Sequence, residues 1–123
     1  MRSRYAARPA VLIVALGLSV ALGACSSDDT TGDAIAVTAG NTDCGVAQTT
    51  LTAGKHSFRV ENTGSQVTEV YVYAPGDKVV AEKEDIGPGT KATFSATLKA
   101  GRYEIACKPG QTGSGIRTPI TVT

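Results

Sequence analysis

Cysteine and histidine are the residue types in this sequence that offer the most specific chemistry. Cysteine occurs at positions 25, 44 and 107, and His56 is the only histidine in 123 residues. In an oxidising compartment, Cys44 and Cys107 would form a disulfide by default, whereas in the reduced state their thiolates would be metal ligands. Their spacing does not decide between these interpretations. A single histidine, which we expect on the surface, does not support a Ser-His-carboxylate enzyme.

The first 24 residues have the layout of an export signal that ends at Cys25. Three arginines precede an apolar run at 10–22, which is too short to span a bilayer comfortably. The sequence Leu22-Gly23-Ala24-Cys25 resembles the lipobox of bacterial lipoproteins, in which the cysteine becomes the acylated first residue. We therefore expect a lipid anchor at Cys25 that holds the protein on the extracytoplasmic face of the cell membrane, in the periplasm or at the cell surface. The alternative is an ordinary secretory cleavage that leaves Cys25 free.

Cleavage before Cys25 would leave a small, slightly acidic chain. Removing 24 residues from 123 leaves 99, and the loss of three arginines leaves 9 basic against 11 acidic residues. With only 2 Phe, 4 Tyr and no Trp in the sequence, nucleic acid is not expected as a partner. Residues 25–33 have no apolar anchor and are expected to be a flexible tether. One domain is predicted at 34–123.

The domain sequence shows the alternation of apolar and polar residues that is typical of β-strands. Strands are predicted at 35–38, 44–49, 56–61, 69–74, 79–80, 92–98, 103–107 and 120–122. Glycine and proline turns separate them at the spacing of a β-sandwich. Residues 98–103 resemble a tyrosine corner, in which the hydroxyl of Tyr103 would bond back to the turn backbone. The sequence therefore predicts an all-β Greek-key sandwich of seven or eight strands.

Two segments resemble the cupredoxins. Residues 51–64 look like their early strand that ends in Asn-x-Gly, and residues 101–107 look like the strand that delivers the copper-ligating cysteine. The closer resemblance is to the cupredoxin-like domain of EfeO-type periplasmic iron-uptake proteins. Its motifs fall at 68–73, 84–89, 106–110 and 113–117, and the resemblance covers residues 34–123. It implies a cupredoxin-like fold and a bound metal.

The resemblance also implies a set of metal ligands. A blue-copper centre uses two histidines, a cysteine and a weak axial ligand, usually methionine. Beyond its signal this sequence has one histidine and no methionine, so blue-copper electron transfer is disfavoured. The Cys and Glu positions of the EfeO-type site fall on Cys44, Glu69, Glu84 and Cys107. Oxygen ligands suit iron and thiolates suit copper or zinc, so the implied ion is iron or copper.

Each acidic member of this set has another interpretation. Glu69 opens a predicted strand and is equally a solvated end residue. Glu84 belongs to the charged segment 82–85, a pattern typical of a protein surface. The glycine-rich loop at 110–115 is not a phosphate loop, because no helix pattern follows it. Arg117, after that loop, is expected to be available to an anion or a carboxylate.

Two classes of function follow. The first is a lipid-anchored, cupredoxin-like, metal-binding protein without chemistry of its own, which is accessory to a membrane metal-uptake complex. In EfeO-type proteins this domain commonly precedes a helical domain that is not found here, which favours an accessory role. The second is a metal-free sandwich, locked by a disulfide between Cys44 and Cys107, that serves as a binding or adhesion module at the cell surface.

Overall fold

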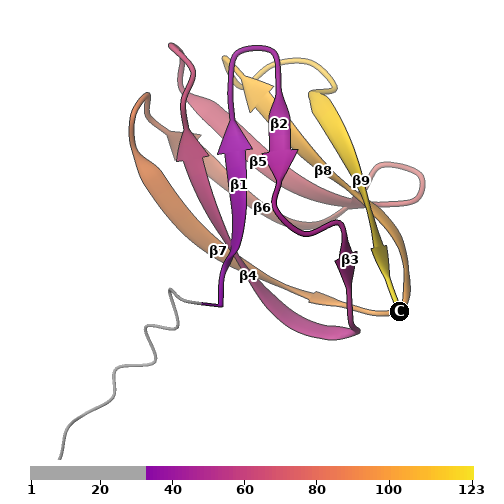
Figure 1. Cartoon of the computed structure of the whole chain (residues 1–123). Coiled ribbons are helices and arrows are strands. Elements are labelled where there is room, and N and C mark those ends of the chain that lie inside the picture. Colours follow the sequence, from indigo (N-terminus) through magenta and orange to yellow (C-terminus); the bar gives the residue numbers. More distant parts are fainter. Residues whose placement is uncertain (1–32) are drawn as a thin grey trace, which may run out of the picture.

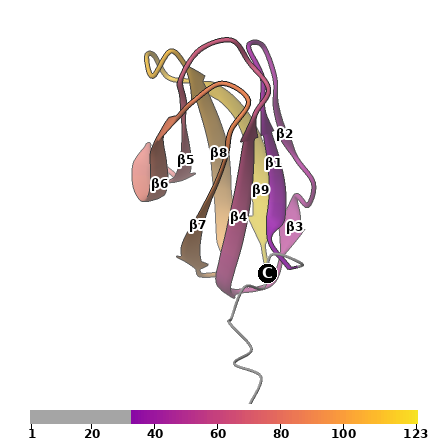
Figure 2. The same cartoon turned by 90° about the vertical axis from the view of Figure 1, so that its left-hand side faces the viewer.

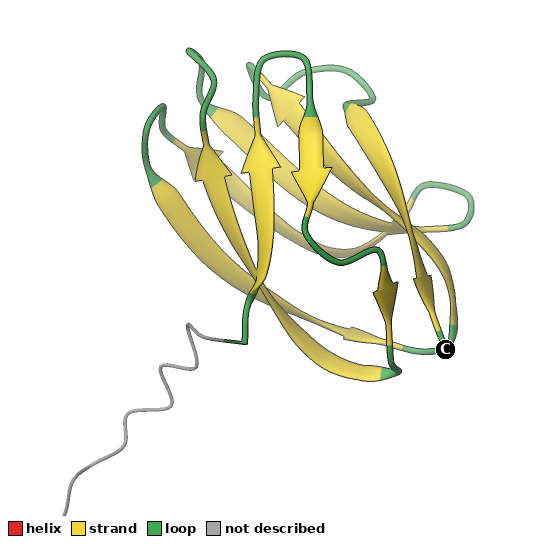
Figure 3. Cartoon of the chain, in the orientation of Figure 1, coloured by secondary structure: helices red, strands yellow, loops and turns green. Residues whose placement is uncertain are grey.

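A computed structural model describes residues 33–123, in which every regular element is a strand (Figures 1 and 3). The predicted export signal and Cys25, and all of the predicted tether except Asp33, lie outside the described residues. Within residues 33–123 there is no helix long and apolar enough to cross a membrane. The nine strands described here pack around one hydrophobic core within this range, so we expect residues 33–123 to fold as a unit.

The strands form two sheets that pack face to face, as the two views in Figures 1 and 2 show. The four-stranded sheet has the order β2-β1-β4-β7, with bounds β1 (Ile35–Ala39), β2 (Cys44–Val46), β4 (Gly54–Asn62) and β7 (Lys91–Leu98). The five-stranded sheet has the order β3-β9-β8-β5-β6, with bounds β3 (Thr50–Leu51), β5 (Thr68–Ala74), β6 (Lys78–Ile86), β8 (Gly101–Pro109) and β9 (Ile116–Val122). The pairs β1–β4 and β3–β9 are parallel, and the other pairs are antiparallel. The predicted all-β sandwich is confirmed.

The core follows from the alternation of side chains along each strand. Every second residue of β1 is buried, and Phe58 and Val60 of β4 are fully covered. Phe58 stacks on Phe94 of β7 with 5.3 Å between the ring centroids. On the facing sheet, Val70, Val72 and Ile105 point inward. Because both sheets present one apolar face, stacking them buries a single hydrophobic core.

Two strands, β6 and β3, depart most from the prediction. β6 runs for nine residues, although only 79–80 was expected to be a strand. Eight of these nine residues are exposed or half-buried, because β6 is the edge of its sheet and pairs only with β5. An edge strand needs no apolar alternation, so its charged sequence gave no strand signal. β3 has two residues, too few for any periodicity, and raises the number of strands to nine.

The tyrosine corner is confirmed. The hydroxyl of Tyr103 donates a hydrogen bond of 2.8 Å to the carbonyl oxygen of Lys99. Gly101, between them, has a φ of 155°, a backbone conformation that residues with a Cβ rarely adopt. The bond fixes the turn from β7 to β8, at the lower end of the sandwich in Figure 1.

A buried asparagine organises the upper end of the sandwich. Asn62, which is 1% exposed, donates hydrogen bonds of 2.7 and 2.8 Å to the carbonyl oxygens of Gln66 and Ile86. Its own side-chain oxygen accepts a hydrogen bond from the backbone N–H of Gly64. These bonds join the loop after β4 to the end of β6. In Figures 1 and 2 the β1–β2, β4–β5 and β8–β9 loops gather at this end.

Candidate functional site

Cys44 and Cys107 are joined by a disulfide that connects the two sheets. Cys44 begins β2 of the four-stranded sheet, and Cys107 lies near the end of β8 in the five-stranded sheet. Their Cα atoms are 5.5 Å apart, and the residues are 6% and 0% exposed. In this oxidised state neither sulfur is a thiolate, so neither is a strong metal ligand. The assignment of the two cysteines as thiolate ligands stays a prediction for the reduced state.

The two predicted glutamates meet at a tyrosine hydroxyl on the outer face of the five-stranded sheet. Tyr71 of β5 lies 3.4 Å from Oε2 of Glu69 and 3.2 Å from Oε1 of Glu84, measured from its hydroxyl oxygen. Glu69 is 8% exposed, whereas Glu84 on the edge strand β6 is exposed. The structure thus places two carboxylates and a phenol together.

The cysteines and the glutamates lie on opposite faces of that sheet. In the register between β5 and β8, Val70 pairs with Cys107, and Glu69 pairs with Lys108. Because successive residues of a strand point to opposite faces, Cys107 enters the core while Lys108 and Glu69 point outward. The structure brings the cysteines together and the glutamates together, but does not bring all four into one cluster. No group of three or more His, Cys, Asp or Glu side chains within residues 33–123 is arranged to hold a metal ion.

Lys108 lies beside the carboxylate of Glu69 and the ring of Tyr71. Its Nζ atom lies 3.6 Å from Oε1 of Glu69, and both side chains are nearly buried, at 12% and 10% exposed. The same ammonium group sits 4.0 Å from the ring centroid of Tyr71, which stacks on Tyr73 at 5.3 Å. Cation–π attraction and the ion pair together hold Lys108 over this group of side chains. We call Glu69, Tyr71, Glu84 and Lys108 the outer-face cluster.

The outer-face cluster shifts two proton equilibria. The pKa of Tyr71 is raised, first by burial and then by the negative charge of Glu69 and hydrogen bonds to Glu82 and Glu84, so Tyr71 stays a neutral phenol. Burial works to lower the pKa of Lys108, but the neighbouring Tyr73 and Glu69 outweigh it and raise this pKa. The cluster therefore holds a charged lysine and a protonated tyrosine across the physiological pH range.

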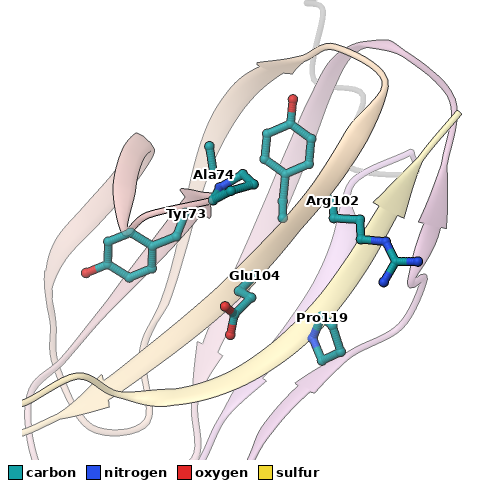
Figure 4. A pocket seen from close by; sticks show the side chains of 7 residues that line it. Tyr73, Ala74, Arg102, Glu104 and Pro119 are labelled. Carbon is teal, nitrogen blue, oxygen red and sulfur yellow. The ribbon is translucent and has the colours of Figure 1, made fainter.

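Arg117 of β9 lies against the second of the two stacked tyrosine rings. Its guanidinium group lies 4.5 Å from the ring centroid of Tyr73, 2.6 Å from a carboxylate oxygen of Asp77 and 3.8 Å from Glu104. Arg117, which was expected to be available to an anion or a carboxylate, is thus paired with two carboxylates of its own chain. A hollow of about 270 Å³ lies beside Tyr73 and Glu104, with Pro119 on its wall (Figure 4).

The described residues do not fit a blue-copper centre. Nε2 of His56 lies 2.7 Å from the carbonyl oxygen of Thr52, near the lower start of β4, whereas Cys107 lies near the opposite end of β8. Copper of that type needs imidazole nitrogens and a thiolate at one point. Here the histidine is distant from the cysteine, and the cysteine is oxidised.

Sequence reasoning did not identify three members of this region. Tyr71, Tyr73 and Lys108 were not singled out, although alternation along the predicted strand 69–74 places Glu69, Tyr71 and Tyr73 on one face. That shared face was the available signal. The order of strands in the sheet determines which strand lies beside this one and therefore which cation covers the tyrosine rings. Local alternation of apolar and polar residues does not specify that order.

The chain is similar to part of an iron-uptake protein. It is 32% identical over 73 residues to the "Iron uptake system component EfeO" of Escherichia coli K12, and equally to that of Shigella flexneri. The matched segment is 59% of this chain but 19% of the relatives. The chain thus spans about a fifth of the length of the curated relatives that it matches.

The fold is similar to that of two solved proteins. The reduced auracyanin of Roseiflexus castenholzii aligns with a TM-score of 0.57 and 17% identity, over 74% of this chain and 97% of that one. Reduced rusticyanin aligns with a TM-score of 0.56 and 19% identity, over 75% and 81%. At these identities the likeness concerns the fold alone. The family model described as "Cupredoxin-like domain" matches residues 10–122. The chain belongs to the cupredoxin-like domain family.

Proposed function

We propose that this protein handles a metal ion on the extracytoplasmic side of the membrane, as an accessory to a metal-uptake complex and without a catalytic step of its own. The proposal is supported by the family match and by the similarity to EfeO, whose name is that of an iron-uptake component. The metal would be cargo that is held and handed on.

The meeting of Glu69 and Glu84 at the hydroxyl of Tyr71 carries this proposal. The three groups offer oxygen donors, which suit a hard ion such as iron better than copper. A soft or borderline ion would favour the sulfurs, but these are bonded to each other on the far side of the sheet. We therefore propose ferric iron as the cargo of the oxidised protein. Copper bound by Cys44 and Cys107 would require their reduction.

Lys108 opposes metal binding at the outer-face cluster. Its ammonium group neutralises Glu69 and lies against Tyr71, so an incoming cation has to displace it. Binding through Tyr71 would also release the phenol proton, whose pKa is raised. Both requirements favour loose, pH-dependent binding that tightens as the pH rises. Such binding suits a protein that passes its cargo on.

The test is ferric iron binding, measured by equilibrium dialysis of residues 33–123 against a weak iron chelate. Glu69→Gln and Glu84→Gln are each expected to lower the affinity about tenfold or more, because each removes a charged donor. Tyr71→Phe should also abolish the visible absorption of an iron–phenolate bond. The matched control is Glu61→Gln, which removes an exposed carboxylate from the opposite sheet, where Glu61 pairs with Lys91.

Equal iron binding by the wild type and the three cluster variants would contradict the proposed site. Equal losses in the cluster variants and in Glu61→Gln would show a general charge effect instead. Copper binding that appears only after reduction and disappears in Cys107→Ser would move the site to the cysteines.

Lipid anchoring at Cys25 is a separate part of the proposal, supported by the sequence Leu22-Gly23-Ala24-Cys25. Replacing Cys25 with alanine is expected to move the protein from the membrane to the soluble fraction, because acyl chains supply the membrane affinity. Cell fractionation with labelled palmitate measures this. The matched control is Ser26→Ala, which leaves the cysteine in place. Unchanged membrane retention and label in Cys25→Ala would count against the anchor.

The second candidate function is a metal-free binding module at the cell surface. It is favoured by the disulfide and by Lys108, which already compensates the charge of Glu69 without a metal. In that case the outer-face cluster would be a structural feature. The dialysis experiment separates the two candidates, because this one expects no specific iron binding by residues 33–123.

A further inference from the structure

The lower end of the sandwich carries a concentration of unpaired cations. Lys55 is the second residue of β4 and pairs with Thr97, Lys99 lies in the turn after β7, and Arg102 is the second residue of β8. Lys78 lies close by, since it lines the same groove as Lys99 and Thr97. None of these four cations forms an ion pair within residues 33–123, whereas Lys91, Lys108 and Arg117 do.

Two acidic residues next to these cations in the sequence are already engaged. Asp77 precedes Lys78, and Glu104 follows Arg102 by two residues, but both carboxylates lie within 4 Å of the guanidinium group of Arg117. In Figure 4, Arg102 lies over β9 and its guanidinium group points away from Tyr73. The cations of this end are therefore free to meet an external anion.

Two exposed apolar side chains lie in the same groove as Lys78 and Lys99. Val79 and Val80 are 48% and 37% exposed. They are two of the three large hydrophobic residues that are exposed within residues 33–123. The register shifts here: Tyr73 pairs with Val79 and Val72 pairs with Ala81, so Val80 is an extra bulge residue. A bulge redirects neighbouring side chains. The valines border a groove of about 300 Å³, which is also lined by Ala74 and Tyr103.

A surface that combines apolar side chains with several unpaired cations is complementary to anionic lipid. Lipid headgroups attract each cation, and the boundary between headgroups and acyl chains accepts small apolar groups. We infer that this basic end, made of Lys55, Lys78, Lys99, Arg102 and the two valines, docks on an anionic membrane surface.

The course of the chain supports a membrane as the occupant. β1 begins in the lower half of the sandwich, because Ile35 pairs with Phe58, three residues from Lys55 (Figure 1). Nine residues lie between Cys25 and Ile35, so the ten steps from one to the other reach at most about 35 Å. An anchor at Cys25 would therefore keep the basic end close to the bilayer. Docking would direct the upper part of the sheet, with Glu69, toward the medium.

The docking is tested without the anchor, by sedimenting residues 33–123 with vesicles of phosphatidylcholine, alone or mixed with phosphatidylglycerol. We expect binding to the mixed vesicles only. Lys99→Gln with Arg102→Gln should weaken this binding about 25-fold, about fivefold for each cation. The matched control, Arg59→Gln with Lys83→Gln, removes the same charge from other parts of the surface and should change binding less than about twofold.

Replacing Val79 and Val80 with serine should also weaken vesicle binding, since they supply the apolar contact. Circular dichroism checks that each variant remains folded. Equal losses in the two charge variants, or no binding of the wild type to mixed vesicles, would overturn the inference. So would equally tight binding to soluble polyglutamate without any effect of the valines, which would assign the basic end to an acidic protein segment. None of these outcomes depends on iron binding or on acylation of Cys25.

Discussion

Reduction of the disulfide between Cys44 and Cys107 is expected to lower the free energy of unfolding by about 4 kcal/mol. The bond closes a loop of 63 residues and links β2 of one sheet to β8 of the other. Such a crosslink removes conformations from the unfolded chain, and its effect grows with the length of the loop. Denaturation of residues 33–123 in urea, with and without a reductant, measures the loss. The thermal midpoint should fall by roughly 15 to 30 °C.

The control is the double variant Cys44→Ala with Cys107→Ala. It should unfold at nearly the same urea concentration as the reduced wild type and should not respond to the reductant. Cys25 lies outside the segment used, so no other thiol contributes. A reduced wild type that keeps the stability of the oxidised protein would contradict the loop argument. A response of the double variant to the reductant would show that the reductant acts elsewhere.

This bond also separates two states with different metal chemistry. The oxidised protein has oxygen donors on its outer face and no thiolate in its core. The reduced protein would gain two thiols at positions that are 6% and 0% exposed, so an ion could reach them only if the packed sheets opened. Stability and thiolate binding therefore oppose each other, whereas the outer-face cluster is reachable with the disulfide intact.

Much of the fold could be predicted from the sequence, because alternation along a strand is a local signal. The central strands, including β4 and β7, have clear apolar alternation and were expected close to their observed bounds. The tyrosine corner was predictable because Gly101 and Tyr103 lie in one short turn. β6 was not, because an exposed edge strand tolerates a charged sequence.

The candidate site was only partly predictable, because it depends on which strands become neighbours. Alternation indicated that Glu69 and Tyr71 share a face. The pairing of Glu69 with Lys108 is a contact between β5 and β8, and no local pattern encodes it. The prediction that the cysteines and glutamates lie together did not take into account that successive residues of a strand point to opposite faces of the sheet. Cys107 lies opposite Val70, an inward residue, so its sulfur is separated from Glu69 by the sheet itself.

Replacing Lys108 with methionine is expected to destabilise the metal-free protein by about 2 to 3 kcal/mol. The substitution keeps an apolar stem over Tyr71 but leaves the carboxylate of Glu69, which is 8% exposed, without a cation. Losing one partner of a nearly buried pair costs more than the pair contributes, because the remaining charge stays desolvated. Urea denaturation at neutral pH measures the loss.

A matched control separates this effect from a general loss of charge. Lys91 pairs with Glu61 at 3.7 Å, but both side chains are about half exposed, so Lys91→Met should cost less than about 1 kcal/mol. Adding Glu69→Gln to Lys108→Met should recover most of the lost stability, because no unpaired charge then remains. Equal costs for Lys91→Met and Lys108→Met, or no recovery in the double variant, would contradict the argument.

The effect of Lys108 should disappear in alkaline solution. The pKa of Lys108 is raised in the folded protein, so its stabilisation is complete below the ordinary lysine pKa of about 10.4 and is lost as the pH rises through the folded value. The wild type and Lys108→Met should therefore differ by a constant amount near neutral pH and begin to converge only above about pH 10.4. A difference that persists in strong alkali would show that the lysine acts through packing alone.

The same substitution should have the opposite effect on iron. Without the ammonium group 3.6 Å from Glu69, an incoming cation meets less repulsion and an uncompensated carboxylate. Lys108→Met should therefore bind ferric iron about tenfold more tightly, which corresponds to about 1.4 kcal/mol. Iron should in turn restore part of the stability that the substitution removes, because a ligand that binds only the folded state stabilises it. Tighter binding combined with lower metal-free stability would mean that Lys108 occupies the position the metal would take. Lower stability without any change in iron affinity would mean that Glu69 and Lys108 serve only the fold.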